Sequence, residues 1–168
     1  MSARAANLLG AHALVVADRM REAAGMELSS AAVLTALETF AGGASIDALR
    51  RVLGLSHSGG VRIVKRLEAE GLVAREPDPA DRRAVRLHLT GDGRREARRL
   101  LAARQAALTP LLAGLGERES AALERLLERL LARATGSGED ANRICRLCEP
   151  DVCGHPDHCP VTQAALGL

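Results

Sequence analysis

The sequence predicts a mainly α-helical fold with one small β-hairpin, and three observations lead to this prediction. Apolar residues recur at three- and four-residue spacings through most of the chain, which is typical of amphipathic helices. Glycines and capping residues divide these periodic segments into pieces of ordinary helix length. One stretch, residues 84–89, alternates between apolar and polar residues as a half-buried strand does.

The composition is that of a chain that folds around one core. Its 168 residues are 47% hydrophobic and approach the usual size of a single domain. The 23 basic and 21 acidic residues nearly cancel, so the net charge of +2 says little about partners. Phe40 is the only Phe, Tyr or Trp, which argues against binding single-stranded nucleic acid by base stacking. The apolar stretches are short and interrupted by charges, so we expect a cytoplasmic protein without a membrane span.

Two helices are expected in the first part of the chain. The first covers residues 5–24 and stops at Gly25. The second begins at a cap provided by Ser29 or Ser30 and ends at the glycine pair 42–43.

The next segment predicts two helices joined by a tight turn. Ser45 caps a short helix over residues 46–53, Gly54 makes the turn, and Ser56 opens a longer helix that continues to Glu70. On the longer helix, one set of residues is expected to face inward and another outward. The inward residues are Val61, Val64 and Leu67, and the outward residues are Arg62, Lys65 and Arg66.

A β-hairpin and two long helices follow. The hairpin pairs residues 72–76 with residues 84–89, and its tip at residues 77–81 contains two prolines that prevent regular pairing. Residues 90–93 cap a helix over 94–112 that is interrupted near Thr109 and Pro110. Residues 117–134 form a last helix with a broad leucine face, which must pack on the first helix or on a second subunit.

Two segments resemble the MarR family of regulators, and the resemblance covers residues 1–134. Residues 55–73, LSHSGGVRIVKRLEAEGLV, look like the recognition helix of the family and its first wing strand. Residues 78–94, DPADRRAVRLHLTGDGR, are similar to the wing and the start of the next helix. The resemblance implies a winged helix-turn-helix with a DNA-binding part at 29–90 and dimerisation helices at 1–25 and 94–134. It also implies a homodimeric transcriptional regulator, usually a repressor, that reads a palindromic operator in double-stranded DNA.

The chemistry of the residues and the resemblance together predict the DNA contacts. Small polar residues at the start of a recognition helix let its backbone approach the duplex, and long cationic side chains reach bases or phosphates. We expect Arg62 at the bases and Lys65 at the backbone, and the resemblance implies that Asp81 orients an arginine of the wing tip in the minor groove. Gly60 stands where the family has an apolar residue, which predicts a loose first turn in the absence of DNA. The predicted DNA-contacting residues are Ser45, Ser56, His57, Ser58, Gly59, Arg62, Lys65, Arg66, Arg82 and Arg83.

Functions other than DNA binding have less support in the sequence. It contains no nucleophile motif, no phosphate-binding glycine loop after a strand and no zinc-protease motif, so no enzymatic activity is expected. A winged helix that docks a protein partner is the main alternative, and it would lack the steep salt dependence of duplex binding. His12 on the first helix is a candidate residue for a small-molecule effector pocket.

The end of the chain has a different composition. A small-polar linker at 135–142 leads into a tail, residues 143–168, that holds all four cysteines with the spacing C-x2-C-x4-C-x5-C. Four thiolates at this spacing predict a structural or sensory zinc site at Cys145, Cys148, Cys153 and Cys159. A [4Fe–4S] cluster, suggested by Pro160 after the last cysteine, and a redox thiol switch without metal are the alternatives. We expect this tail to fold back on the dimerisation helices.

Overall fold

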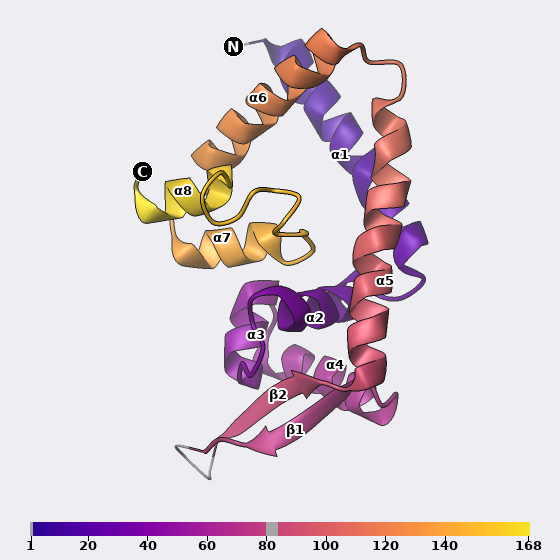
Figure 1. Cartoon of the computed structure of the whole chain (residues 1–168), viewed down its shortest axis with the longest axis vertical. Helices are drawn as coiled ribbons and strands as arrows, with labels where there is room; N and C mark the ends of the chain where they lie inside the picture. The colour runs from indigo at the N-terminus through magenta and orange to yellow at the C-terminus, as the bar shows by residue number, and fades with distance from the viewer. Residues whose placement is uncertain (1, 80–83) are drawn as a thin grey trace.

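The computed structural model of the chain describes residues 2–79 and 84–168. The described residues form eight α-helices, one 3-10 turn and one antiparallel hairpin (Figure 1). In chain order the elements are α1 (Ala3–Ala24), α2 (Leu28–Thr39), α3 (Ile46–Leu53), α4 (His57–Ala69), β1 (Val73–Pro77), β2 (Val85–Leu89), α5 (Gly91–Leu108), η1 (Thr109–Leu112), α6 (Glu117–Ala134), α7 (Gly138–Cys145) and α8 (Pro160–Leu166). The prediction of a mainly α-helical winged helix-turn-helix fold is confirmed.

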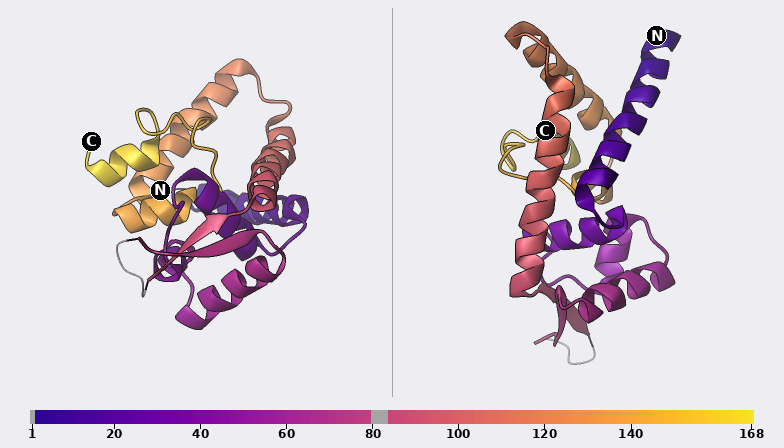
Figure 2. Two further views of the ribbon diagram at one scale, coloured as in Figure 1. Left: turned by 60° about the horizontal axis from the view of Figure 1, so that its bottom comes forward. Right: turned by 90° about the vertical axis from the view of Figure 1, so that its right-hand side faces the viewer.

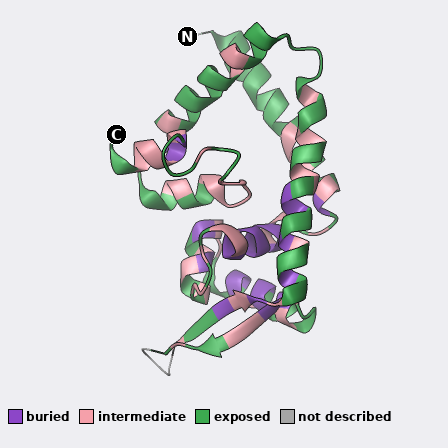
Figure 3. Cartoon of the chain, in the orientation of Figure 1, coloured by how far each residue is buried: buried purple, intermediate pink, exposed green. Residues whose placement is uncertain are grey.

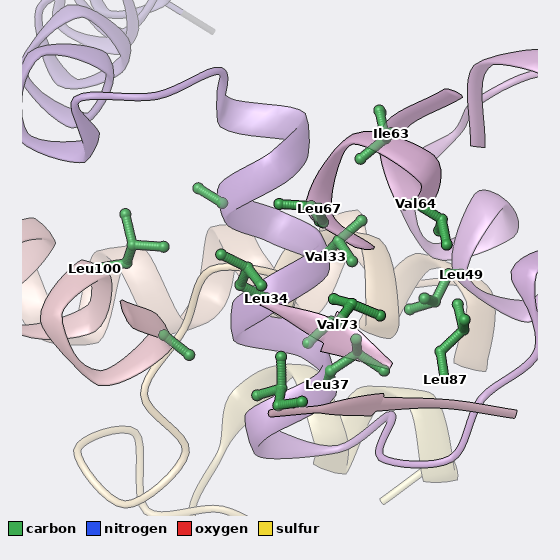
Figure 4. Close-up of a cluster of buried hydrophobic side chains, with 14 of the residues drawn as sticks. Val33, Leu34, Leu37, Leu49, Ile63, Val64, Leu67, Val73, Leu87 and Leu100 are labelled. Atoms are coloured by element: carbon green, nitrogen blue, oxygen red, sulfur yellow. The ribbon is translucent and has the colours of Figure 1, made fainter. Parts of the chain in front are cut away.

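The main core lies in the winged unit, which we define as residues 28–89, where it meets the first half of α5. Leu34, Leu49, Leu67 and Leu87 come from α2, α3, α4 and β2 and are at most 2% exposed (Figure 4). Buried residues gather in this part of the molecule, whereas α1, the far half of α5 and α6 are mostly exposed (Figure 3). Helices α1 and α5 pack against each other and extend from the same side of the winged unit (Figure 2).

Side-chain caps begin several helices where the sequence places them. The hydroxyl of Ser45 accepts a hydrogen bond from Ala48 N at 3.2 Å, and that of Thr90 accepts one from Gly93 N at 3.0 Å. The predicted cap of the second helix was wrong, because α2 begins earlier, with Glu27 as its N-cap. Ser30 is instead buried inside the first turn, where its hydroxyl meets a side chain of α4.

The hairpin pairs Val73 with Leu89 and Pro77 with Val85. Leu87 and Leu89 are buried, as the alternation predicts, while Val85 at the far end is exposed. Pro77 was expected in the irregular tip but is the last residue of β1, a position at the end of the ladder that proline tolerates.

The buried face of α4 differs from the predicted one by one position. Ile63, Val64 and Leu67 are buried, whereas Val61 is only half-buried. Gly60 lies on this inner face against α3, and a Cβ atom there would stand 3.2 Å from Cβ of Arg50. The glycine therefore has a packing role, since it lets the two helices approach closely.

The tail is more ordered than the sequence predicts. Residues 138–142, expected as linker, are the first part of α7, which Ser137 caps by accepting a hydrogen bond from Asp140 N. Helix α7 packs on α3 and α8 packs on α6 (Figure 1). The tail therefore contacts the winged unit as well as a predicted dimerisation helix.

Two apolar helix faces remain uncovered in the single chain. Leu126, Leu127 and Leu130 of α6 are 44–53% exposed, and Leu8 and Leu14 of α1 are 54% and 69% exposed. Of the two partners predicted for the leucine face of α6, the first helix does not cover these leucines. No described helix is both long enough and apolar enough to span a bilayer.

Hydrogen bonds join the start of α5 to the backbone just before β1. The carbonyl of Leu72 accepts a hydrogen bond from Thr90 N at 3.1 Å, and the Thr90 hydroxyl donates to the carbonyl of Gly71 at 2.6 Å. Gly93 faces the backbone of Leu72, the residue before β1, and a Cβ atom on it would overlap the Leu72 carbonyl oxygen and stand 2.9 Å from the carbonyl carbon. Only glycine fits here without moving the backbone of α5 or β1.

Replacing Gly93 with alanine should therefore destabilise the protein by about 1–3 kcal/mol, the usual cost of overpacking. Urea denaturation followed by circular dichroism measures the change. Gly91→Ala is the matched control, because its Cβ would meet only the end of the Arg95 side chain at 3.7 Å. Equal free energies of unfolding for the two variants would contradict this account of the α5–wing junction.

Candidate nucleic-acid interface and metal centre

The outer face of α4 presents a cationic surface. Arg62 and Lys65 are exposed on the side opposite the buried face of the helix, and His57 and Ser58 are exposed in its first turn. The helix thus divides into an apolar side that anchors it and a polar side that is open to a partner. Four of the predicted contact residues are thus exposed on α4, and two of these, His57 and Ser58, also have partners within the chain.

The remaining predicted residues near the start of α4 have partners within the chain. Ser56 caps the helix by accepting a hydrogen bond from Gly59 N at 3.2 Å, and its hydroxyl lies 3.2 Å from that of Ser58. Gly59 itself is buried. Ser45 is exposed, but its hydroxyl caps α3. These residues fix the start of α4 and so position its exposed cationic surface. The backbone amide of Gly59 already donates its hydrogen bond to Ser56.

Asp47 of α3 connects the two helices of the helix-turn-helix, and the sequence motifs alone did not point to it. Its Oδ1 accepts a hydrogen bond from Arg50 at 2.6 Å and lies 3.3 Å from Nδ1 of His57. The hydrogen bond from Arg50, followed by that from His57, lowers the pKa of the Asp47 carboxyl. The carboxylate therefore holds the first residue of α4 against α3.

Arg66 was predicted to contact DNA, but the structure gives it partners on α2. Its guanidinium donates to Glu27 Oε2 at 2.5 Å and to the Ser30 hydroxyl at 2.6 Å. The hydrogen bond from Arg66 lowers the pKa of Glu27. Arg66 thus joins the C-terminal part of α4 to the N-terminus of α2.

The base of the wing tip carries an ion pair that the sequence reasoning did not single out. Arg86 Nε donates to Asp78 Oδ2 at 2.8 Å, and Asp78 N donates to the carbonyl of Ala84 at 3.0 Å. The hydrogen bond to Asp78 raises the pKa of Arg86. The signal was present in the sequence, since an acidic residue of the predicted tip stands close to a basic residue on the second arm of the predicted hairpin. Asp81, Arg82 and Arg83, the predicted tip residues, lie outside the described residues.

The four cysteines converge from two helices and the loop between them. Cys145 ends α7, Cys159 is the N-cap of α8, and Cys148 and Cys153 lie between these helices. All four line one cavity of about 100 Å³, together with residues that include Phe40 and His155. All four are free thiols in the structure.

The thiols interact with one another. The hydrogen bond between Cys145 and Cys148 raises the pKa of Cys145 and lowers that of Cys148 to about 6, where the Arg104 guanidinium also favours the thiolate. Burial raises the pKa of Cys153. One thiolate supported by neighbouring thiols is a suitable starting point for binding a metal.

Within residues 2–79 and 84–168, no three His, Cys, Asp or Glu side chains are placed to hold a metal ion as they stand. Tetrahedral zinc with bonds of about 2.3 Å requires sulfurs about 3.8 Å apart. The structure thus provides four thiol donors around one cavity, and a zinc ion bound there would bring their sulfurs to this spacing.

A second cavity lies between α1 and the winged unit. It has a volume of about 430 Å³, and its lining includes His12 and Met20 of α1, Leu28 of α2, Leu53 of α3 and Leu147 of the tail. His12 thus lines a hollow of the size and apolar character that a small-molecule site requires.

Comparison with protein families identifies the winged unit. A family model described as the MarR family matches residues 24–84. The uncharacterized HTH-type transcriptional regulator YsmB of Bacillus subtilis (strain 168) is 35% identical over 68 residues, which are 40% of this chain and 47% of that protein. The chain thus spans about half the length of this curated relative.

Solved structures match a larger part of the chain. A MarR family protein from Bacillus stearothermophilus superposes with a TM-score of 0.69 at 27% identity, over 77% of this chain and 95% of that one. The PcaV transcriptional regulator of Streptomyces coelicolor, solved in complex with its natural ligand, is 31% identical over 75% of this chain and 87% of its own, with a TM-score of 0.52.

Proposed function

This chain belongs to the MarR family of transcriptional regulators, and we propose that it acts as a homodimeric repressor that binds a palindromic operator in double-stranded DNA. The observation that carries the proposal is the two-sided α4, with an apolar face fixed in the core and Arg62 and Lys65 exposed on the other side. A helix anchored in this way can enter a major groove without unfolding any part of the core. The proposed location is the cytoplasm, and no enzymatic activity is proposed.

Lys65→Ala should weaken binding to duplex DNA and make the dependence of affinity on salt less steep, by about one unit of the log–log slope for each phosphate that is no longer neutralised. Arg62→Ala should weaken binding and relax base preference at one position of the operator. Fluorescence anisotropy with a duplex selected from a random library measures both effects. Arg133→Ala on the exposed surface of α6 is the matched control. Affinity that does not respond to salt in the wild type would support the protein-docking alternative instead.

The uncovered leucines of α1 and α6 support the homodimer. Exposed apolar faces of this extent are unfavourable in water, and a second copy would cover them by a self-complementary contact. Two copies would also present two α4 helices to the two halves of a palindrome, with centres about 34 Å apart.

Leu130→Glu should therefore shift the protein from dimer to monomer, because a carboxylate would be buried in an apolar interface. Light scattering coupled to size-exclusion chromatography measures the mass. Leu166→Glu is the control, since Leu166 is also exposed but lies on α8, outside the leucine face of α6. A wild-type protein that is monomeric at micromolar concentration would contradict the proposal.

We also propose that the four-cysteine site binds a metal cofactor, with zinc as the first candidate and a [4Fe–4S] cluster as the second. Zinc would have to draw the four sulfurs together around one ion. In a cubane cluster each cysteine binds a different iron atom, so the ligands stand farther apart, and the cavity between the cysteines supports this alternative. A thiol switch without metal is the remaining candidate.

Elemental analysis and a visible spectrum of full-length protein purified without oxygen separate these candidates. Zinc gives about one equivalent per chain and no colour, whereas a [4Fe–4S] cluster gives about four irons and a brown solution. Cys145→Ser should lower the metal content in either case. Wild-type protein that contains neither metal would overturn the cofactor proposal and leave the thiol switch.

A small-molecule or redox effector completes the proposed function. The cavity that His12 lines is the candidate site for a small molecule, and the structure of PcaV was solved with its natural ligand. The four thiols are the candidate redox site.

A further inference from the structure

The cysteine segment, residues 145–159, connects two parts of the molecule that the sequence separates. At one end, α7 packs on α3, where Glu139 lies 3.8 Å from Arg51 and the Arg143 guanidinium adjoins Gly54 in the turn before α4. At the other end, α8, which carries the buried Val161, packs on α6. The cysteine segment thus connects α7, which packs on the helix-turn-helix, to α8, which packs on the last long helix (Figure 1).

The two residues between Cys145 and Cys148 are inserted into the winged unit. The hydroxyl of Thr35, in the buried helix α2, donates to the backbone carbonyl of Arg146 at 2.6 Å. Leu147 packs against the main core and shares a small cavity with Leu28 and Leu100, from α2 and α5. A hydrogen bond and an apolar contact of this kind fix both the backbone and the side chain of the insertion.

A change at the cysteines therefore has a direct path to the DNA-reading helix. Cys145 and Cys148 flank the insertion, so a group that holds both thiols also fixes the backbone of residues 146 and 147. The insertion touches α2, and α2 shares one core with α3 and α4 through Leu34, Leu49 and Leu67. Because such cores are densely packed, a displaced side chain in one helix moves its neighbours.

We propose that the occupancy of the four-cysteine site controls DNA affinity by setting how the Arg146–Leu147 insertion docks between α2 and α5. This inference rests on the proposed function, since it assigns the regulation of the same site. In this proposal, a change at the cysteines of the tail alters the affinity of α4 for DNA. A purely structural zinc knuckle would stabilise the tail without changing the affinity for DNA.

A double-mutant cycle on the full-length protein tests the proposal. Leu147→Ala removes the inserted side chain, and Cys153→Ser removes one exposed ligand without opening the core. Each variant should change the affinity for the selected operator duplex by about fivefold or more in the same direction, and the double variant should change it no further than the larger single effect. Thr35→Val, which deletes the hydrogen bond at nearly constant volume, should act in the same direction as Leu147→Ala.

Val152→Ala is the matched control, because Val152 belongs to the cysteine segment but is 66% exposed. Its affinity for DNA should equal that of the wild type. Thermal unfolding of every variant, followed by circular dichroism, shows whether a loss of affinity is merely a loss of fold. Thr35→Val and Cys153→Ser keep the test decisive if Leu147→Ala does not fold.

The outcomes separate the two proposals. If the wild type binds duplex DNA and the cysteine and insertion variants bind it equally well, the proposed control of DNA affinity by the cysteine site is wrong. The proposed function as a DNA-binding regulator is then still supported. Effects of Cys153→Ser and Leu147→Ala that multiply would show two independent perturbations and would also overturn the coupling. If the wild type binds no duplex, the proposed function fails and the coupling fails with it.

Discussion

Burial of α2 on every side is the constraint on which the rest of the structure depends. All residues from Ser30 to Leu37 are buried, so this short helix has no solvent face. It packs on α1 and α5 on one side and on α3, α4 and β2 on the other. The helices that leave the winged unit and the helix that presents the cationic surface are therefore positioned by the same core.

The charged residues of α4 have two different roles because they lie on different sides of this arrangement. Arg66 lies near the start of α2 and is held by Glu27 and Ser30, so its charge serves the packing of two helices. Arg62 and Lys65 point away from the core and remain available on the surface. Asp47, Arg50 and His57 then fix the first turn of α4 against α3. The surface proposed to contact DNA is thus small, and ion pairs lie beside it.

Sequence periodicity predicted the elements up to α6 well, because helix ends are governed by local chemistry such as the caps at Ser45, Ser56 and Thr90. It did not predict the short helices α7 and α8 of the tail. It failed where a tertiary contact decides the outcome. Ser30 is buried against Arg66 and does not cap α2, and Gly93 is required by the carbonyl of Leu72, the residue before β1. The outward charges of α4 could be predicted from spacing, but the pairing of Arg66 with Glu27 could not, since 39 residues separate them.

The tail and the proposed dimer interface share one helix, and this links two features that the sequence presents as separate. Helix α6 packs on α8, and therefore holds one end of the cysteine segment, while its leucines at 126, 127 and 130 remain exposed.

In a homodimer that covers those leucines, the position of α6 would be fixed by the partner subunit. The cysteine segment would then connect a fixed helix to the winged unit through α7 and the Arg146–Leu147 insertion. A short segment attached to a fixed support can move a DNA-reading unit, whereas the same segment on a freely mobile helix could not. The proposed dimer would therefore hold α6 in place, which the proposed regulation through the cysteines requires.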